Sequence, residues 1–119
     1  MEKLSIDIET YSDVDLAKAG VYRYVESPAF EILLFGVRVD GGPVHVYDLA
    51  CGETLPDEII DAFVNDTVLK WAYNASFERI CISRWLRKAH PAAFCHYAPL
   101  GDAIGDYLNP VSWRCSRIW

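Results

Sequence analysis

A strict alternation of apolar and polar residues near the N-terminus is the sequence feature that most constrains the fold. Three apolar residues alternate with three polar ones, in the order Leu4, Ser5, Ile6, Asp7, Ile8 and Glu9. This period of two predicts a β-strand with one apolar face and one polar face. The chain is therefore expected to begin with a strand whose polar face bears two carboxylates.

The residues after this strand predict a long loop and then a β-hairpin. Residues 10–29 mix Asp, Gly, Ser and Pro with scattered tyrosines, and they support at most a short helical turn around residues 14–19. We interpret this segment as a functional loop. Two apolar runs, residues 31–40 and 43–49, flank Gly41-Gly42, which predicts a hairpin with its turn at the two glycines.

Two helices and one strand are predicted in the middle of the chain. A helix is expected over residues 56–65, a short buried strand over 68–73, and a second helix from Asn74 or Ser76 to about Lys88. A helical crossover normally returns a strand parallel to its neighbour, so this order predicts a mixed sheet with helices packed on it. The 119 residues, 52% of them hydrophobic, suffice for a single α/β domain over residues 1–119.

The C-terminal residues predict a further helix that is incomplete. Ser112 is a candidate N-cap for a helix from Trp113 onward, and the sequence ends at Trp119 after about two turns without a stop signal. We therefore expect the domain to be C-terminally incomplete. Trp113, Ile118 and Trp119 would give this short helix a large apolar area, which predicts self-association into a homo-oligomer through the C-terminal segment.

Charge and composition exclude several classes of protein. The net charge of −6 repels phosphate backbones at long range and argues against a simple electrostatic nucleic-acid binder. The longest uncharged apolar run, residues 32–37, is far shorter than the roughly 20 residues that cross a membrane, and the acidic N-terminus is unlike a secretory signal. A cytoplasmic location is the default. The four cysteines include no Cys-x-x-Cys pair, so they are expected to be buried and reduced rather than zinc-bound.

Asp7 and Glu9 are the first candidates for chemistry. Side chains two residues apart on a strand leave the same face, so the two acids lie about 7 Å apart along the strand. Two anions so placed repel each other unless a cation joins them, and Mg²⁺ or Mn²⁺ prefers oxygen ligands of this kind. The alternative is a strand end whose acids simply face solvent.

Glu78 is the third candidate. It begins a helical stripe that continues through Cys81, Ile82 and Trp85, so it lies on the apolar side of the second helix. A carboxylate directed at the sheet needs a partner there. Metal binding would supply one, and the alternative is that an acid in the first turn stabilises the helix dipole.

Two segments together resemble the first two motifs of the DEDD-type 3′–5′ exonucleases, which have a ribonuclease-H-like fold. Asp7-Ile8-Glu9-Thr10 is similar to the first motif, Asp-x-Glu-Thr, and Asn74-Ala75-Ser76-Phe77-Glu78 is similar to the second. The sequence around them is similar to the N-terminal exonuclease region of phage and prophage family A DNA polymerases. The similar segments include Gly20-Val21-Tyr22 and Ser112-Trp113-Arg114-Cys115. This resemblance covers nearly the whole chain.

The resemblance implies a two-metal exonuclease that acts on DNA 3′ ends and proofreads for a downstream polymerase region. The catalytic metal ligands for Mg²⁺ or Mn²⁺ would be Asp7, Glu9 and Glu78. Thr10 and Asn74 would contact the substrate, and Phe77 of the same motif would anchor the helix in the core. Glu78 stands where the family usually has Asp, which lengthens this ligand arm by one methylene.

The fourth acid of the family is expected beyond Trp119. Asp102 and Asp106 are alternatives, but they precede the helix predicted from Trp113, whereas the family places its last acid after that helix. With three acids, the 119 residues are expected to have little or no exonuclease activity. Two other interpretations stay open. One is a non-catalytic exonuclease-like remnant or interaction module, and the other is an RNA-directed nuclease on the same scaffold.

Overall fold

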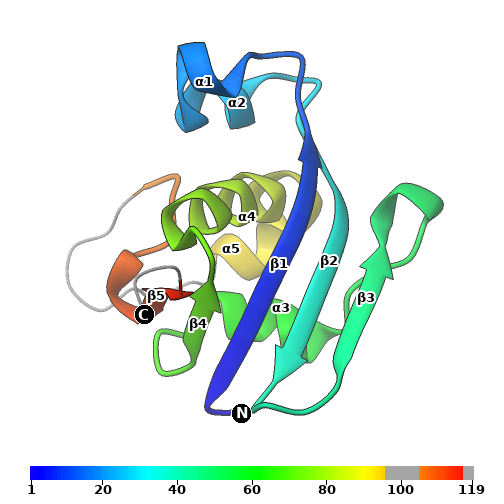
Figure 1. The fold of residues 1–119 in the computed structure, drawn as a ribbon, viewed down its shortest axis with the longest axis vertical. Coiled ribbons are helices and arrows are strands. Elements are labelled where there is room, and N and C mark those ends of the chain that lie inside the picture. The colour runs from blue at the N-terminus through cyan, green and yellow to red at the C-terminus, as the bar shows by residue number, and fades with distance from the viewer. Residues whose placement is uncertain (96–104, 117–119) are drawn as a thin grey trace.

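The computed structural model describes residues 1–95 and 105–116, and this part of the chain forms a five-stranded sheet (Figure 1). The strand order is β3-β2-β1-β4-β5. The strands are β1 (Lys3–Tyr11), β2 (Glu31–Val39), β3 (Val44–Asp48), β4 (Leu69–Ala72) and β5 (Trp113–Cys115). The predicted mixed α/β class is confirmed.

β1 lies at the centre of the sheet and joins its antiparallel half to its parallel half. β2 pairs antiparallel with β1, and β3 pairs antiparallel with β2, so the hairpin predicted around Gly41-Gly42 is confirmed. β4 pairs parallel with β1, and β5 pairs parallel with β4. Strands that return after a helical connection are expected to run parallel to a neighbour.

Helices cover one face of the sheet. In Figure 1, α3 (Asp57–Phe63), α4 (Ala75–Ala89) and α5 (Pro91–Cys95) lie behind the strands. α3 and α4 match the two predicted helices, whereas α5 was not predicted. Within residues 1–95 and 105–116, none of the helices combines the length and the apolar character that crossing a membrane requires.

The core lies between these helices and the sheet. Leu4 and Ile6 of β1 are buried, as is Phe35 of β2. The Phe35 ring centroid lies 5.8 Å from that of Phe63 in α3 and 4.9 Å from that of Trp85 in α4. The apolar residues of β1 thus face the helices, and its polar residues lie on the opposite face of the sheet, as the alternation predicts.

The interpretation of residues 10–29 as a loop with at most one helical turn is partly wrong. α1 (Leu16–Ala19) corresponds to that turn and is capped by Asp15, whose carboxylate accepts from the backbone N–H of Ala17 and Lys18. The segment also contains α2 (Val21–Glu26), which the sequence does not indicate. Tyr24 and Val25 of α2 are buried, so tertiary packing rather than local propensity forms this helix.

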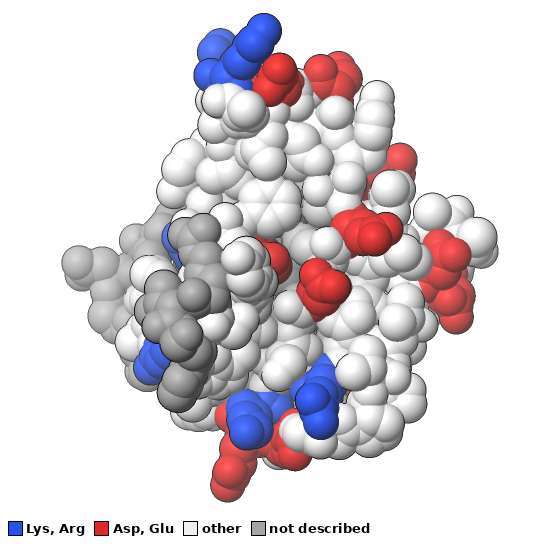
Figure 2. All heavy atoms as spheres, viewed as in Figure 1, with Lys and Arg blue, Asp and Glu red and all other residues white. Residues whose placement is uncertain are grey.

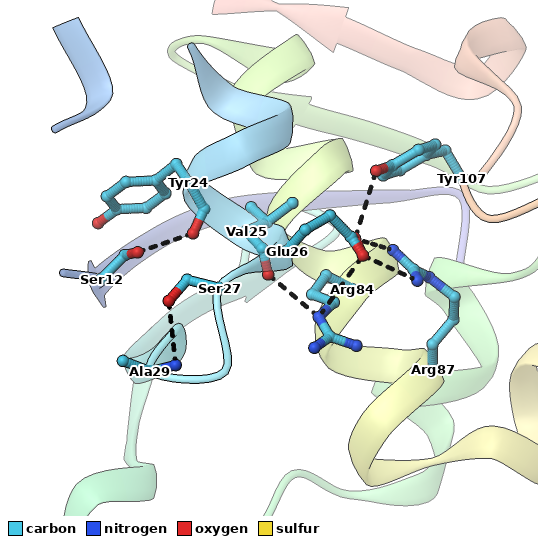
Figure 3. A network of polar contacts seen from close by, with 9 residues as sticks. All are labelled: Ser12, Tyr24, Val25, Glu26, Ser27, Ala29, Arg84, Arg87 and Tyr107. Atoms are coloured by element: carbon cyan, nitrogen blue, oxygen red, sulfur yellow. Dashed lines mark hydrogen bonds and ion pairs between the residues drawn. The ribbon is translucent and has the colours of Figure 1, made fainter. Parts of the chain in front are cut away.

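Polar contacts hold α2 against α4 (Figure 3). Arg87 Nη2 lies 3.0 Å from Glu26 Oε2, and the Tyr107 hydroxyl donates to the same oxygen at 3.5 Å. Arg84 Nε donates to the carbonyl of Val25 at 3.0 Å. The Arg87 hydrogen bond is the main cause that lowers the pKa of Glu26, so this carboxylate stays charged in the folded protein.

The helix predicted from Trp113 is wrong, because this residue begins β5. A 3₁₀ turn over Pro110–Ser112, capped by the Asn109 side chain, precedes an extended Trp113 that pairs with Lys70 of β4. Trp113 is only 7% exposed, so its apolar area is buried within this chain. It therefore adds little to a surface for a second copy, and the other two residues of this prediction, Ile118 and Trp119, lie outside the described residues, as do residues 96–104.

The prediction of buried, reduced cysteines holds only in part. Cys51, Cys81 and Cys115 are free. Cys81 is buried in α4, but Cys51 is exposed in the short 3₁₀ turn that follows β3. Burial is thus decided by each element's position and not by residue type alone.

Lys70 is a buried cation in the core face of β4. Its side chain has no exposed surface, its Nζ donates to the carbonyl of Asn65 at 2.8 Å, and the same atom lies 5.7 Å from the centroid of the Trp113 ring. Burial lowers the pKa of Lys70 from its ordinary value of 10.5 to about 8, against the opposing charge of Asp66. The protein therefore holds this charge at neutral pH at a cost in stability.

We expect the free energy of unfolding to rise between pH 8 and about pH 10.5 through Lys70. In this range folded Lys70 has lost its proton while the unfolded chain still binds it, so the unfolded state binds more protons and stability increases with pH. The gain is limited to about 3 kcal/mol. Urea unfolding across this range, compared with Lys70→Met, measures it. The other titrating groups contribute equally to both proteins, so their effect cancels in the comparison. If the free energy of unfolding changed with pH in the same way in both proteins, the prediction would be wrong.

Candidate functional site

The ends of two parallel strands place the two predicted motifs at one edge of the sheet. β4 ends at Ala72, which pairs with Ile6, while β1 continues to Tyr11. Asp7 therefore follows directly after the last residue of β1 that pairs with β4. α4 begins at Ala75, just beyond the end of β4. Because β1 and β4 are parallel, the acids of β1 and the first turn of α4 lie at the same end of the sheet.

Asp7 and Glu9 are exposed on the face of the sheet opposite the helices. Asp7 lies across from Gly36 of β2, and Glu9 lies across from Leu34. The register shifts between Glu9 and Thr10, and such a bulge changes the direction of neighbouring side chains. Figure 2 shows acidic side chains over the middle of β1, with Lys and Arg side chains nearer the ends of this face.

Glu78 is directed inward, as its place on the apolar stripe of α4 predicts. It is only 7% exposed and lies in the first turn of the helix. Its charge also acts on Cys81, one turn later. Burial is the main cause that raises the pKa of the Cys81 thiol, and the Glu78 carboxylate contributes further. Glu78 therefore does not point to bulk solvent, the position that would exclude a site shared with Asp7.

The acids of β1 fit a hard divalent cation as a pair. Mg²⁺ in proteins is commonly held by one or two carboxylates, with waters and substrate phosphates completing its shell. In residues 1–95 and 105–116, no three His, Cys, Asp or Glu side chains come together in a group that could hold a metal ion. Asp7 and Glu9 thus have the donor chemistry for the ion, and an ion shared with Glu78 stays a prediction.

The two alternatives for a fourth acid gain no support. Asp102 lies outside the described residues. Asp106 is exposed, and its charge is one of the influences that raise the pKa of Arg87 in α4. Arg87 lies about 13 Å further along α4 than Glu78 at 1.5 Å per residue. Asp106 therefore belongs near the polar contacts of α2 and α4 rather than near the acids of β1.

The predicted substrate-binding residues lie around the two motifs. The Thr10 hydroxyl shares a hydrogen bond of 2.8 Å with the Tyr24 hydroxyl, in which either can donate. Asn74 is the N-cap residue of α4, and its backbone carbonyl accepts from the N–H groups of Phe77 and Glu78. Phe77 is partly buried and packs against the core, as expected for a residue that anchors α4.

Tyr24 is the residue near this site that the sequence does not reveal. It lies in α2, is 9% exposed, and its ring centroid lies 6.1 Å from that of Phe77. It therefore contacts both Thr10 and Phe77. Tyrosines recur in residues 10–29, and no spacing in the sequence distinguishes this one from Tyr22.

A shallow groove of about 290 Å³ opens beside Asp7 on the face that the helices do not cover. Gly36 lies across from Asp7, and Val44 and Val46 of β3 form one wall with 63% and 60% of their surface exposed. A second cavity of about 470 Å³ is lined by residues such as Trp85 and includes none of the predicted site residues. Of the two acids of β1, Asp7 lines this groove and Glu9 does not.

The chain is similar in sequence to a phage polymerase. It is 47% identical over 118 residues to the DNA polymerase of Bacillus phage SP02. The matched region makes up 99% of this chain and 15% of that polymerase. No family model and no solved structure matches the chain. The chain is therefore homologous to part of a phage DNA polymerase.

Gly36 leaves room for a small side chain beside Asp7. A Cβ at Gly36 would meet the Asp7 carbonyl oxygen at 3.5 Å and the Asp7 Cβ at 3.8 Å, which are ordinary contacts. We expect Gly36→Ala to raise the free energy of unfolding by roughly 0.5–1 kcal/mol, because alanine loses less backbone entropy in a strand. Urea unfolding measures this change.

Gly20→Ala is the matched control, because Gly20 has a φ of 86° that an alanine rarely adopts. This variant is expected to lower the stability. A loss of stability in Gly36→Ala of similar size would show that the backbone around Asp7 does not tolerate the added methyl group.

Proposed function

We propose that this chain is the N-terminal part of a metal-dependent 3′–5′ exonuclease region of a phage-type DNA polymerase, acting on DNA 3′ ends. The observation that supports it best is the exposed pair Asp7 and Glu9 on the central strand, in the part of β1 that extends past the end of β4 toward the start of α4, whose first turn bears the buried Glu78. The similarity to the SP02 polymerase agrees with this proposal, since it covers both motifs.

The sheet supports a ribonuclease-H-like fold within this proposal. An antiparallel hairpin, β2 and β3, lies on one side of β1, and the parallel strands β4 and β5 lie on the other. In this arrangement the acids of a central strand and the start of a following helix lie toward the same end of the sheet. DNA and the remainder of a polymerase are the partners that the proposed function requires.

Each residue of the site would have a separate role in phosphodiester cleavage. Mg²⁺ or Mn²⁺, when bound, would supply activation of a water and stabilisation of negative charge on the leaving oxygen. Asp7 and Glu9 would hold the cation on the face of the sheet that the helices leave open, where both side chains are exposed. Thr10 and Asn74 contact the terminal nucleotide, and Phe77 keeps the first turn of α4 in the core. Without a cation, the acids of β1 repel the phosphate.

A non-catalytic exonuclease-like module is the second candidate. The observation that favours it is the lack of a three-residue metal-binding group in the described part of the chain. The two candidates differ in one property that can be measured directly. An exonuclease region binds Mn²⁺ through Asp7 and Glu9, whereas a module that keeps only the fold does not.

We expect the 119-residue chain to bind Mn²⁺, and Asp7→Asn or Glu9→Gln to weaken the binding at least tenfold. Removing an outer-shell partner of a metal already costs about 10–100-fold, so losing a direct ligand costs no less. Titration calorimetry with MnCl₂ measures the affinity. Asp61→Asn is the control, because it removes the same charge from an exposed position in α3.

Nucleotide release from labelled single-stranded DNA in Mn²⁺ gives a second readout, measured on a longer polymerase chain that supplies the fourth acid, because the 119 residues alone are expected to have little or no activity. Where Asp7→Asn removes a ligand worth about 4 kcal/mol of transition-state stabilisation, release falls by about a thousandfold. A chain that binds no Mn²⁺ contradicts the proposed exonuclease and supports the non-catalytic module. Release from RNA but not from DNA would assign the same site to an RNA-directed nuclease.

A further inference from the structure

We infer that Tyr24 is a positioning residue that holds the two acidic motifs at a fixed separation. This inference rests on the proposed function. Tyr24 touches the residue that follows Glu9 and the residue that precedes Glu78. Its hydroxyl shares a 2.8 Å hydrogen bond with the Thr10 hydroxyl, and its ring centroid lies 6.1 Å from that of Phe77. One side chain therefore joins both motifs.

The contact with Thr10 acts at the point where the direction of β1 changes. The register with β2 shifts between Glu9 and Thr10, so the ladder of backbone hydrogen bonds is irregular there. A side-chain hydrogen bond at this position fixes the first residue after the bulge and with it the direction of Glu9. The Tyr24 hydroxyl is the group that supplies this bond.

The contact with Phe77 acts on the first turn of α4. Phe77 is partly buried, and its neighbour Glu78 is directed inward. The Tyr24 ring also packs edge-on against Phe30, with a centroid distance of 5.8 Å, which limits its freedom to turn. A ring held on one side by Phe30 presents a fixed surface to Phe77 and sets how far α4 lies from β1.

The backbone of α2 is hydrogen-bonded both to the residue that follows β1 and to α4. The Ser12 hydroxyl donates to the carbonyl of Tyr24 at 2.8 Å, next to the end of β1. Arg84 of α4 donates to the carbonyl of Val25 at 3.0 Å (Figure 3). The backbone that bears Tyr24 is therefore attached to the same two elements that its side chain contacts. A shift of either motif would therefore displace Tyr24, and Tyr24 in turn would displace the other motif.

The test separates the Tyr24 hydroxyl from its ring. Tyr24→Phe keeps the ring contacts and removes the hydrogen bond, and we expect it to weaken Mn²⁺ binding about fivefold, which equals about 1 kcal/mol. Thr10→Val removes the same bond from the other side. In a double-mutant cycle the combined variant is expected to show no further loss, because both changes remove one interaction. Tyr24→Leu removes the ring as well and is expected to weaken binding more.

Ser12→Ala is the matched structural control. It removes a hydrogen bond of the same length between the end of β1 and α2, but not at Thr10, and it also removes the bond of 3.2 Å that the Ser12 hydroxyl accepts from the Val14 N–H. It should lower the free energy of unfolding at least as much as Tyr24→Phe and leave Mn²⁺ affinity unchanged. Affinity that falls equally in both variants would assign Tyr24 a merely structural role and overturn the inference.

The measurements distinguish a failure of the positioning role from a failure of the proposed function. Mn²⁺ binding that is lost in Asp7→Asn but unchanged in Tyr24→Phe overturns the positioning role and leaves the proposed function in place. An unaltered chain that binds no Mn²⁺ overturns the proposed function and the positioning role together. Additive losses in the Thr10 and Tyr24 cycle show that the two hydroxyls act separately, which also overturns the inference.

Discussion

The parallel pairing of β1 with β4 stops at Ile6 and Ala72, and the arrangement of the site depends on where it stops. β1 continues to Tyr11 while the chain leaves β4 and enters α4 at Ala75. The acids of β1 therefore follow the last paired residues, at the edge where α4 begins. A longer β4 would move the start of α4 away from Asp7 and Glu9, and Glu78 with it.

The charged side chains of this protein differ in the desolvation free energy that their positions require. Asp7 and Glu9 are exposed, so their charges remain hydrated and are inexpensive. Lys70 is fully buried and depends on the Asn65 carbonyl and on the ring of Trp113. Since Trp113 begins β5, the position of that short strand and the environment of Lys70 depend on each other. The edge strand of the parallel half, β5, is therefore in direct contact with the ionisable side chain of Lys70.

Local patterns in the sequence account for most of the fold and for the three acids. The alternation in residues 4–9, the glycines of the hairpin and the predicted helix start at Asn74 or Ser76 are local, and each agrees with the structure, where Asn74 is the N-cap residue of α4 without a side-chain cap bond. Glu78 could be assigned inward from its helical stripe alone. α2 and β5 depend instead on contacts with distant residues: Tyr24 packs on Phe77, and Trp113 pairs with Lys70. A short helix or strand of this kind has no local signal strong enough to reveal it.

The two sets of contacts that hold α2 differ in how strongly they constrain it. Glu26 is 44% exposed, and an ion pair in contact with water contributes only about 0–1 kcal/mol, so its bond to Arg87 fixes α2 weakly. Tyr24 is 9% exposed and makes ring contacts on two sides, where a displaced aromatic ring would leave a gap in the packing. The ring of Tyr24 therefore constrains the position of α2 more strongly than the Glu26–Arg87 ion pair does.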